Sequence, residues 1–195
     1  WMYLNRPADN GGCGWDYGYH IDMMYGTDGQ DTQAFGARDN TWDNPLDNGA
    51  AYGSAVPQLY VDLAYNDLTL RMGKFYTIMG YEVVQAPQNW FYSHSWTMVL
   101  AEPFTHTGVL AMYDLNDCWS ISGGFHRGWD QWEDNNEDLG FLGGVTWTSP
   151  CEDTSVALAV TASNEDDAGV NNRFMYSVVL TQKLTECLTY VLQHD

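Results

Sequence analysis

Apolar and polar side chains alternate with a period of two along most of this chain. Between Trp15 and Tyr25 every odd position is aromatic or aliphatic. The even positions of the same segment include Asp16, His20 and Asp22. Successive side chains of a β-strand point to opposite faces of the sheet, so this segment is predicted to be a strand with one apolar face and one small or charged face.

The alternation recurs along the rest of the chain, and no stretch holds a helical period with caps at both ends. We predict strands at 1–6, 15–25, 59–65, 68–72, 119–129, 139–147, 156–160, 174–180 and 188–192, with a less regular one at 107–113. The pattern therefore indicates an all-β chain of about ten strands, well above the strand content of an ordinary domain.

The connections between these strands alternate between short and long. The short turns are Asn66-Asp67, Asn116-Asp117, the group at 150–153 and Thr185-Glu186, and the long segments are 26–55, 78–105, 130–138 and 163–172. Short turns at one end and long polar loops at the other describe an antiparallel up-and-down meander, the layout of an outer-membrane barrel. We predict a transmembrane β-barrel forming a single domain over 1–195. Because both chain ends read as strands, we expect a partial barrel that lacks strands at both ends.

Composition narrows the function classes. Lys plus Arg number 7 against 26 Asp plus Glu, which gives a formal net charge of -19. Nucleic acid and anionic membrane surfaces need clustered cations, so neither is an expected partner. Aromatic residues reach 15%, which favours a folded chain over an acidic disordered one. No apolar run approaches the roughly 18 residues of a membrane-spanning helix, so a helical membrane protein is not predicted.

The alternation is also compatible with a second hypothesis. In this alternative the chain is a secreted soluble β-sandwich that binds carbohydrate or binds another ligand with calcium. In such a domain the apolar face would be core and the polar face would be solvated. Two features favour the barrel: the unequal loops, and aromatic residues near strand ends, where lipid-facing barrels place their girdles. These residues are Trp15, Tyr25, Tyr65, Tyr113, Trp119, Trp129 and Trp147.

Five segments of the chain resemble a β-barrel porin family of planctomycetes, the OmpL-like, porin-2 type. They are IDMMYGTD at 21–28, VPQLY at 56–60, GKFYTIMGYE at 73–82, NWFYSHS at 89–95 and EPFTHTG at 102–108. The resemblance spans most of the chain. It implies an outer-membrane barrel that forms a passive, water-filled diffusion channel for small hydrophilic solutes or ions, with outer-membrane lipid around it. The sequence contains no phosphate-binding loop and no cofactor motif, so we expect neither enzyme activity nor a cofactor, and the oligomeric state stays open.

The polar face of the predicted strands supplies the candidate pore-lining residues. They are Asp16, His20, Asp22, Asp62, Arg71, Lys74, Ser120, Ser122 and His126. The long segment 78–105 is rich in aromatic residues, which would expose apolar area without gain if it projected into water. We predict that it packs against the inward face and narrows the lumen. Its candidate constriction residues are Glu82, Trp90, His94, Glu102 and the adjoining His106.

Metal and catalytic alternatives have weaker support. The spacing of His94, Glu102 and His106 matches no zinc pattern, and no G-x-S-x-G nucleophile motif occurs. The acidic loop residues fit no EF-hand spacing, although ions bridging the loops stay open. These residues are Asp28, Asp31, Asp39, Asp43, Asp47, Asp130, Glu133, Asp134, Glu137, Asp138, Glu165, Asp166 and Asp167.

The four cysteines all map to the predicted short-turn end. Cys13 precedes the second strand, and Cys118, Cys151 and Cys187 lie in or next to short turns. In a Gram-negative envelope this end faces the oxidising periplasm. Neighbouring hairpins would bring Cys151 towards Cys118 or Cys187, but the sequence does not choose among the three possible pairings.

Overall fold

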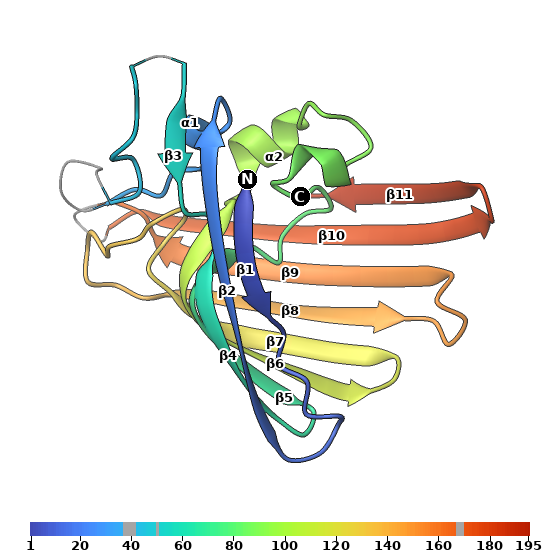
Figure 1. Cartoon of the computed structure of the whole chain (residues 1–195). Helices are drawn as coiled ribbons and strands as arrows, with labels where there is room; N and C mark the ends of the chain where they lie inside the picture. Colours follow the sequence, from blue (N-terminus) through green and yellow to red (C-terminus); the bar gives the residue numbers. More distant parts are fainter. Residues whose placement is uncertain (37–41, 50, 167–169) are drawn as a thin grey trace.

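One antiparallel sheet of 11 strands forms most of the molecule (Figure 1). The structure is a computed structural model and describes residues 1–36, 42–49, 51–166 and 170–195. The strands are β1 (Met2–Arg6), β2 (Trp15–Gly26), β3 (Gly53–Ala55), β4 (Leu59–Tyr65), β5 (Leu68–Tyr76), β6 (Thr105–Asn116), β7 (Trp119–His126), β8 (Gly140–Thr148), β9 (Thr154–Asn164), β10 (Asn172–Thr185) and β11 (Leu188–His194). The short helices are α1 (Gly29–Thr32), the 3-10 turn η1 (Ala86–Gln88) and α2 (Trp96–Ala101). No helix within the described ranges is long and apolar enough to cross a membrane.

The strands pair in the order in which they occur, as the meander prediction requires. The order is β1-β2-β4-β5-β6-β7-β8-β9-β10-β11, and the short β3 pairs with the end of β2. The sheet curls along its length, but β1 and β11 do not pair with each other, so the wall stays open. The predicted fold class, a partial up-and-down antiparallel barrel, is confirmed.

The two ends of the sheet differ as predicted. At one end the strands are joined by 7–14, 66–67, 117–118, 149–153 and 186–187, which we call the short-turn rim. At the other end the connections are 27–58, 77–104, 127–139 and 165–171, and these carry the helices and β3. In Figure 1 the short-turn rim runs along the lower and right margins, and the long connections gather at the left and top.

The apolar face of the sheet is the exposed, outer one. On β2, Trp15, Tyr17 and Met23 are 74%, 56% and 49% exposed, whereas Asp22 is buried. The other strands show the same exposed apolar positions, for example Val61, Val109, Ile121, Phe141 and Leu158. A soluble sandwich would bury these side chains against a second sheet. The observed arrangement is the reverse and matches a barrel whose outer face is apolar.

Glycines on the inner face permit the tight curl of the wall. A Cβ on Gly108 would lie 2.1 Å from the Phe125 carbonyl oxygen, and one on Gly124 would lie 2.0 Å from the Val109 carbonyl oxygen. These distances are far shorter than any real contact of a methyl group with oxygen. Neighbouring strands approach this closely only because both positions lack a side chain.

Candidate functional site

A charged pair lies at mid-height on the inner face. The Arg71 guanidinium donates from Nε and Nη2 to the two carboxylate oxygens of Asp62, both at 2.9 Å. Its plane covers the Tyr60 ring, with Cζ 3.9 Å from the ring centroid. Asp62 and Arg71 are direct cross-strand partners on β4 and β5, which explains the two-pronged geometry. Both residues were predicted to line the interior, and the structure brings them together there.

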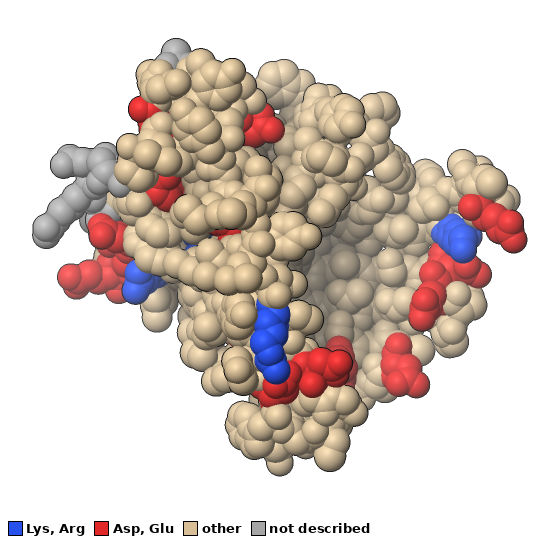
Figure 2. Space-filling view, viewed as in Figure 1, with Lys and Arg blue, Asp and Glu red and all other residues tan. Residues whose placement is uncertain are grey.

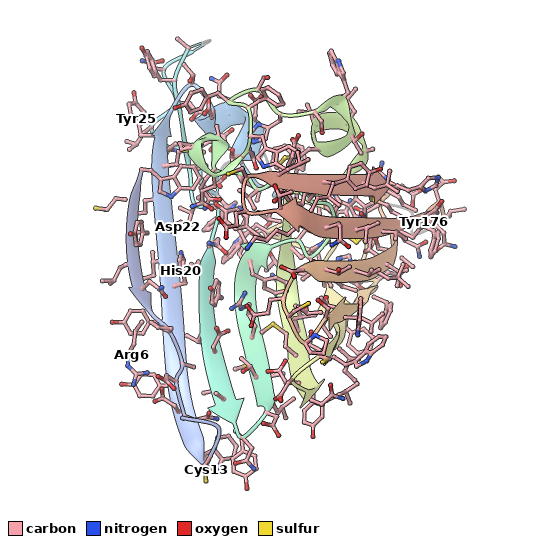
Figure 3. The ribbon with its side chains drawn as sticks, turned by 90° about the vertical axis from the view of Figure 1, so that its right-hand side faces the viewer. Arg6, Cys13, His20, Asp22, Tyr25 and Tyr176 are labelled. Carbon is pink, nitrogen blue, oxygen red and sulfur yellow. The ribbon has the colours of Figure 1, made fainter. Side chains whose placement is uncertain are left out.

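A second polar group extends along β2 on the same face. His20 Nε2 lies 2.7 Å from Asp22 Oδ1, and the Gln58 amide donates to Asp22 Oδ2 at 3.0 Å. The His20 ring stacks on Tyr60 with centroids 5.4 Å apart, which joins this group to the Arg71 pair. In Figure 3, β2 runs from Cys13 at one end, past His20 and Asp22, to Tyr25 at the other. Tyr60 and Gln58 were not predicted, because the sequence did not show that neutral side chains would complete this network.

Two predicted serines face open space near the short-turn rim. Ser120 and Ser122 line a hollow of about 340 Å³ on the inner face, together with Asp67, Thr69, Asp114 and Thr146. Figure 2 looks into the concave side of the sheet. Asp16, also predicted to line the interior, lies towards the same end and accepts from Arg6 Nη2 at 3.0 Å. This part of the inner face is polar and open.

The stem of the long connection, 77–81, crosses the interior near the opposite end. Met79 is buried in a cluster with Phe75, Leu110, Leu142 and Met175, and Ile78 packs against it. The Gly80 amide donates to Ser177 Oγ at 3.2 Å, and the Tyr81 amide donates to Gln193 Oε1 at 2.9 Å. These contacts tie the segment that follows β5 to the inner faces of β10 and β11. The stem of this connection therefore packs against the inner face of the sheet.

The prediction of inward packing is wrong for the tip of the connection, 82–101. Trp90, Phe91 and Trp96 are 60%, 73% and 80% exposed. Several hydrogen bonds of the tip are internal: Glu82 accepts from the Ser95 amide at 2.8 Å, and His94 Nε2 donates to the Val83 carbonyl at 3.1 Å. The tip also contacts the sheet, because the Gln85 side-chain amide donates to the Tyr76 hydroxyl of β5 at 3.1 Å. Within the tip, only Val84 and Met98 are buried.

Three predicted pore-lining residues are almost fully buried, although Asp22 still borders a pocket together with His20 and Gln85. Asp22 and His126 have exposures of 1% and 0%, and Lys74 is also 0% exposed. The His126 ring is covered by Thr161, whose hydroxyl is 2.9 Å from Nε2, and by Gly128. The alternation predicts on which face of the sheet a side chain lies. It does not predict that a loop from elsewhere in the chain covers that side chain.

Lys74 shows such covering by a distant loop most clearly. Its ammonium lies 3.6 Å from the Asp43 carboxylate, beneath the Trp42 ring, so the first long connection supplies its partner. Burial raises the pKa of Asp43, and nearby Lys74 opposes that shift. Asp130, from the third long connection, accepts from the Phe104 and Thr105 amides at 2.9 and 2.8 Å, and burial raises its pKa to about 6. Lys74 therefore anchors loops and adds no positive charge to the open interior.

The suggested metal cluster does not assemble. His94 binds within the tip, whereas His106 lies enclosed against His126, with ring centroids 4.4 Å apart, and Thr77 Oγ1 is 3.1 Å from its Nε2. Glu102 accepts from the Gln193 amide and lies against Gly80, and burial raises its pKa to about 7. No three His, Cys, Asp or Glu side chains in the described part of the chain could hold a metal ion. Two of the acidic loop residues considered for bridging ions, Asp39 and Asp167, lie outside the described residues.

The four cysteines lie on the short-turn rim, as predicted from the turn pattern. Cys13 is in the β1–β2 connection, and Cys118, Cys151 and Cys187 occupy three hairpin turns. All four are free thiols. None of the suggested pairings is formed.

Comparison with known proteins places the chain in a family. The family model "Putative beta-barrel porin-2, OmpL-like" matches residues 1–195, the whole chain. The chain belongs to this β-barrel porin family, which confirms the resemblance noted in its sequence. Neither the curated proteins nor the solved structures contain a match.

Proposed function

We propose that this protein forms a passive, water-filled channel in the outer membrane for small hydrophilic solutes or ions. The main support for the proposal is the polarity of the sheet, which is the reverse of that in a soluble domain. Apolar side chains cover the exposed outer face, whereas charged and hydroxyl side chains occupy the concave inner face. A porin needs both properties, an outer face that lipid can solvate and an inner face that water can wet.

The inner face also indicates which solutes would pass. The stem at 77–81 narrows the interior near the long connections, which favours small solutes. Asp62 and Arg71 neutralise each other, and Lys74 is withdrawn beneath the loops. Asp67 and Asp114 remain at the open hollow. We therefore propose a preference for cations.

A channel requires a closed wall. Among the described residues, no strand pairs with the outer backbone edge of β1 or of β11. Unpaired amides and carbonyls are costly in hydrocarbon, where no water can satisfy them. We propose that further strands complete the barrel between these two edges.

Planar-bilayer recording tests the proposal. The protein is purified in detergent and added to a bilayer, and single-channel conductance is measured. We expect discrete steps with an ohmic current–voltage relation, as a passive pore gives. A protein that stays soluble and monodisperse without detergent and shows no conductance would instead support the secreted binding module.

A further inference from the structure

Every cysteine of the chain is presented at one rim of the sheet. The chain has 4 cysteines, and each lies in a different connection of the short-turn rim. Cys13, Cys151 and Cys187 are exposed, and Cys118 is half-buried. Figure 3 shows Cys13 at the extreme end of the molecule, far from Tyr25 at the other end of β2. Reagents in water can therefore reach this row of thiols.

The thiols of this row are unpaired in the structure. The turns that carry Cys118, Cys151 and Cys187 follow one another at intervals of two strands in the sheet order. Two strand spacings amount to about 10 Å. A disulfide needs Cα atoms about 4.4–6.8 Å apart. Cys13 is farther from the others, because the β4–β5 turn, which has no cysteine, lies between. All four thiols are therefore available for reaction with a partner.

Carboxylates surround the thiols. Asp117 precedes Cys118, Glu152 follows Cys151, and Glu186 precedes Cys187 in the chain, and all three carboxylates are exposed. The acidic residues in or next to the short-turn rim are Asp9, Asp16, Asp67, Asp114, Asp117, Glu152, Asp153 and Glu186, and the cations there are Arg6 and Lys183. Acidic side chains gather along the lower and right margins of the molecule in Figure 2. Such a field attracts cations and repels anions within about 10 Å at moderate salt.

We propose that the short-turn rim forms mixed disulfides with a cationic protein or peptide that carries an accessible disulfide. A rim thiolate attacks one sulfur of that disulfide, a new S–S bond joins the rim to the partner, and the partner's own S–S bond breaks. The departing sulfur leaves as a thiolate and takes up the proton that the rim thiol released. The exchange is balanced and consumes no separate oxidant. Only the compartment in which it occurs, the periplasm, rests on the proposed function.

Charged small disulfides test the chemistry directly. The full chain in nonionic detergent is treated separately with cystamine, bis(2-hydroxyethyl) disulfide and 3,3'-dithiodipropionate, which are dicationic, neutral and dianionic. Adducts are counted over time by intact mass. At low ionic strength we expect adduct formation to be about tenfold faster with cystamine than with dithiodipropionate. At about 1 M salt the two rates should converge.

A matched variant assigns the selectivity to the rim. Asp117→Asn combined with Glu152→Gln and Glu186→Gln keeps all four thiols, and should reduce the rate ratio to about threefold or less. Glu133→Gln, an exposed change in the long connection 127–139, should leave the ratio unchanged. Equal rates with all three probes at low salt would overturn the proposal. So would a mass loss of about 2 Da per cysteine pair without adducts, because it would mean that the rim forms internal disulfides. The assay needs no pore, so its failure is separate from a failure of the bilayer recording.

Discussion

One buried carboxyl fastens the stem of the long connection to the end of the sheet. Glu102 is only 7% exposed, accepts from the Gln193 amide of β11 and lies against the backbone of Gly80. Burial raises its pKa from 4.5 to about 7. The folded chain therefore holds this proton more tightly than the unfolded chain does.

This difference predicts a pH-dependent stability. Between about pH 4.5 and 7 the folded state binds more protons than the unfolded state, so the contribution of Glu102 to the free energy of unfolding falls as pH rises and levels off above 7. The total change is on the order of 1–3 kcal/mol. Urea unfolding in detergent at pH 5 and pH 8 measures it. Glu102→Gln should remove this part of the pH dependence, whereas the exposed Glu133→Gln should keep it. An unchanged profile in Glu102→Gln would contradict the assignment.

At the scale of elements, curvature depends on particular inner-face glycines. Gly124 faces the Val109 carbonyl so closely that a Cβ would lie 2.0 Å from its oxygen, whereas a Cβ on the adjacent Gly123 would meet nothing within 4 Å. We expect Gly124→Ala to force β6 and β7 apart and to lower the free energy of unfolding by about 2–4 kcal/mol. Gly123→Ala on the same strand is the matched control and should change it by less than about 1 kcal/mol. Equal effects of the two substitutions would mean that the loss of backbone entropy at glycine, and not the close approach of β6 and β7, determines the change in the free energy of unfolding.

The strands and turns were predictable because their signals are local. The period of two marked β2 and the later strands, and pairs such as Asn66-Asp67 marked the tight turns. The loop that covers a strand end comes from a distant part of the sequence, so local patterns do not predict it. Lys74 contacts Asp43 across a chain separation that no periodic pattern reports. Trp90 and Phe91 in the tip are exposed, although apolar content alone predicted that they would be buried. The alternation identified Asp62 and Arg71 as inner-face residues. That they lie directly opposite each other depends on the strand register, which the alternation does not specify.

For the whole molecule, the polarity of the two faces separates a membrane barrel from a soluble module. Val109 is 42% exposed on the outer face of β6, and Ser120 faces the inner hollow from β7. In lipid, Val109→Arg should cost about 2–4 kcal/mol if the position lies near the bilayer midplane. Ser120→Arg should be tolerated, because water and the carboxylates of Asp67 and Asp114 are close. Protease protection in lipid vesicles measures the folded fraction of each of the two variants. Normal insertion of Val109→Arg would argue that the outer face does not meet lipid.

Ion selectivity follows from which charges remain uncompensated along the interior. The Asp62 carboxylate is held by Arg71, and Lys74 is paired with Asp43 outside the open space, so Asp67 and Asp114 dominate the hollow near the short-turn rim. Two negative charges at this open end of the interior enrich cations within about 8 Å at physiological salt. We expect the protein in a planar bilayer under a tenfold potassium chloride gradient to give a reversal potential of the sign for cations, roughly 20–40 mV in size. Asp67→Asn combined with Asp114→Asn should bring it to less than about half of that value without abolishing conductance, whereas Glu133→Gln should not change it. A reversal potential of the sign for anions in the unsubstituted protein would contradict the charge argument but not the pore itself. Loss of selectivity in Glu133→Gln would instead place the responsible charge in the long connections.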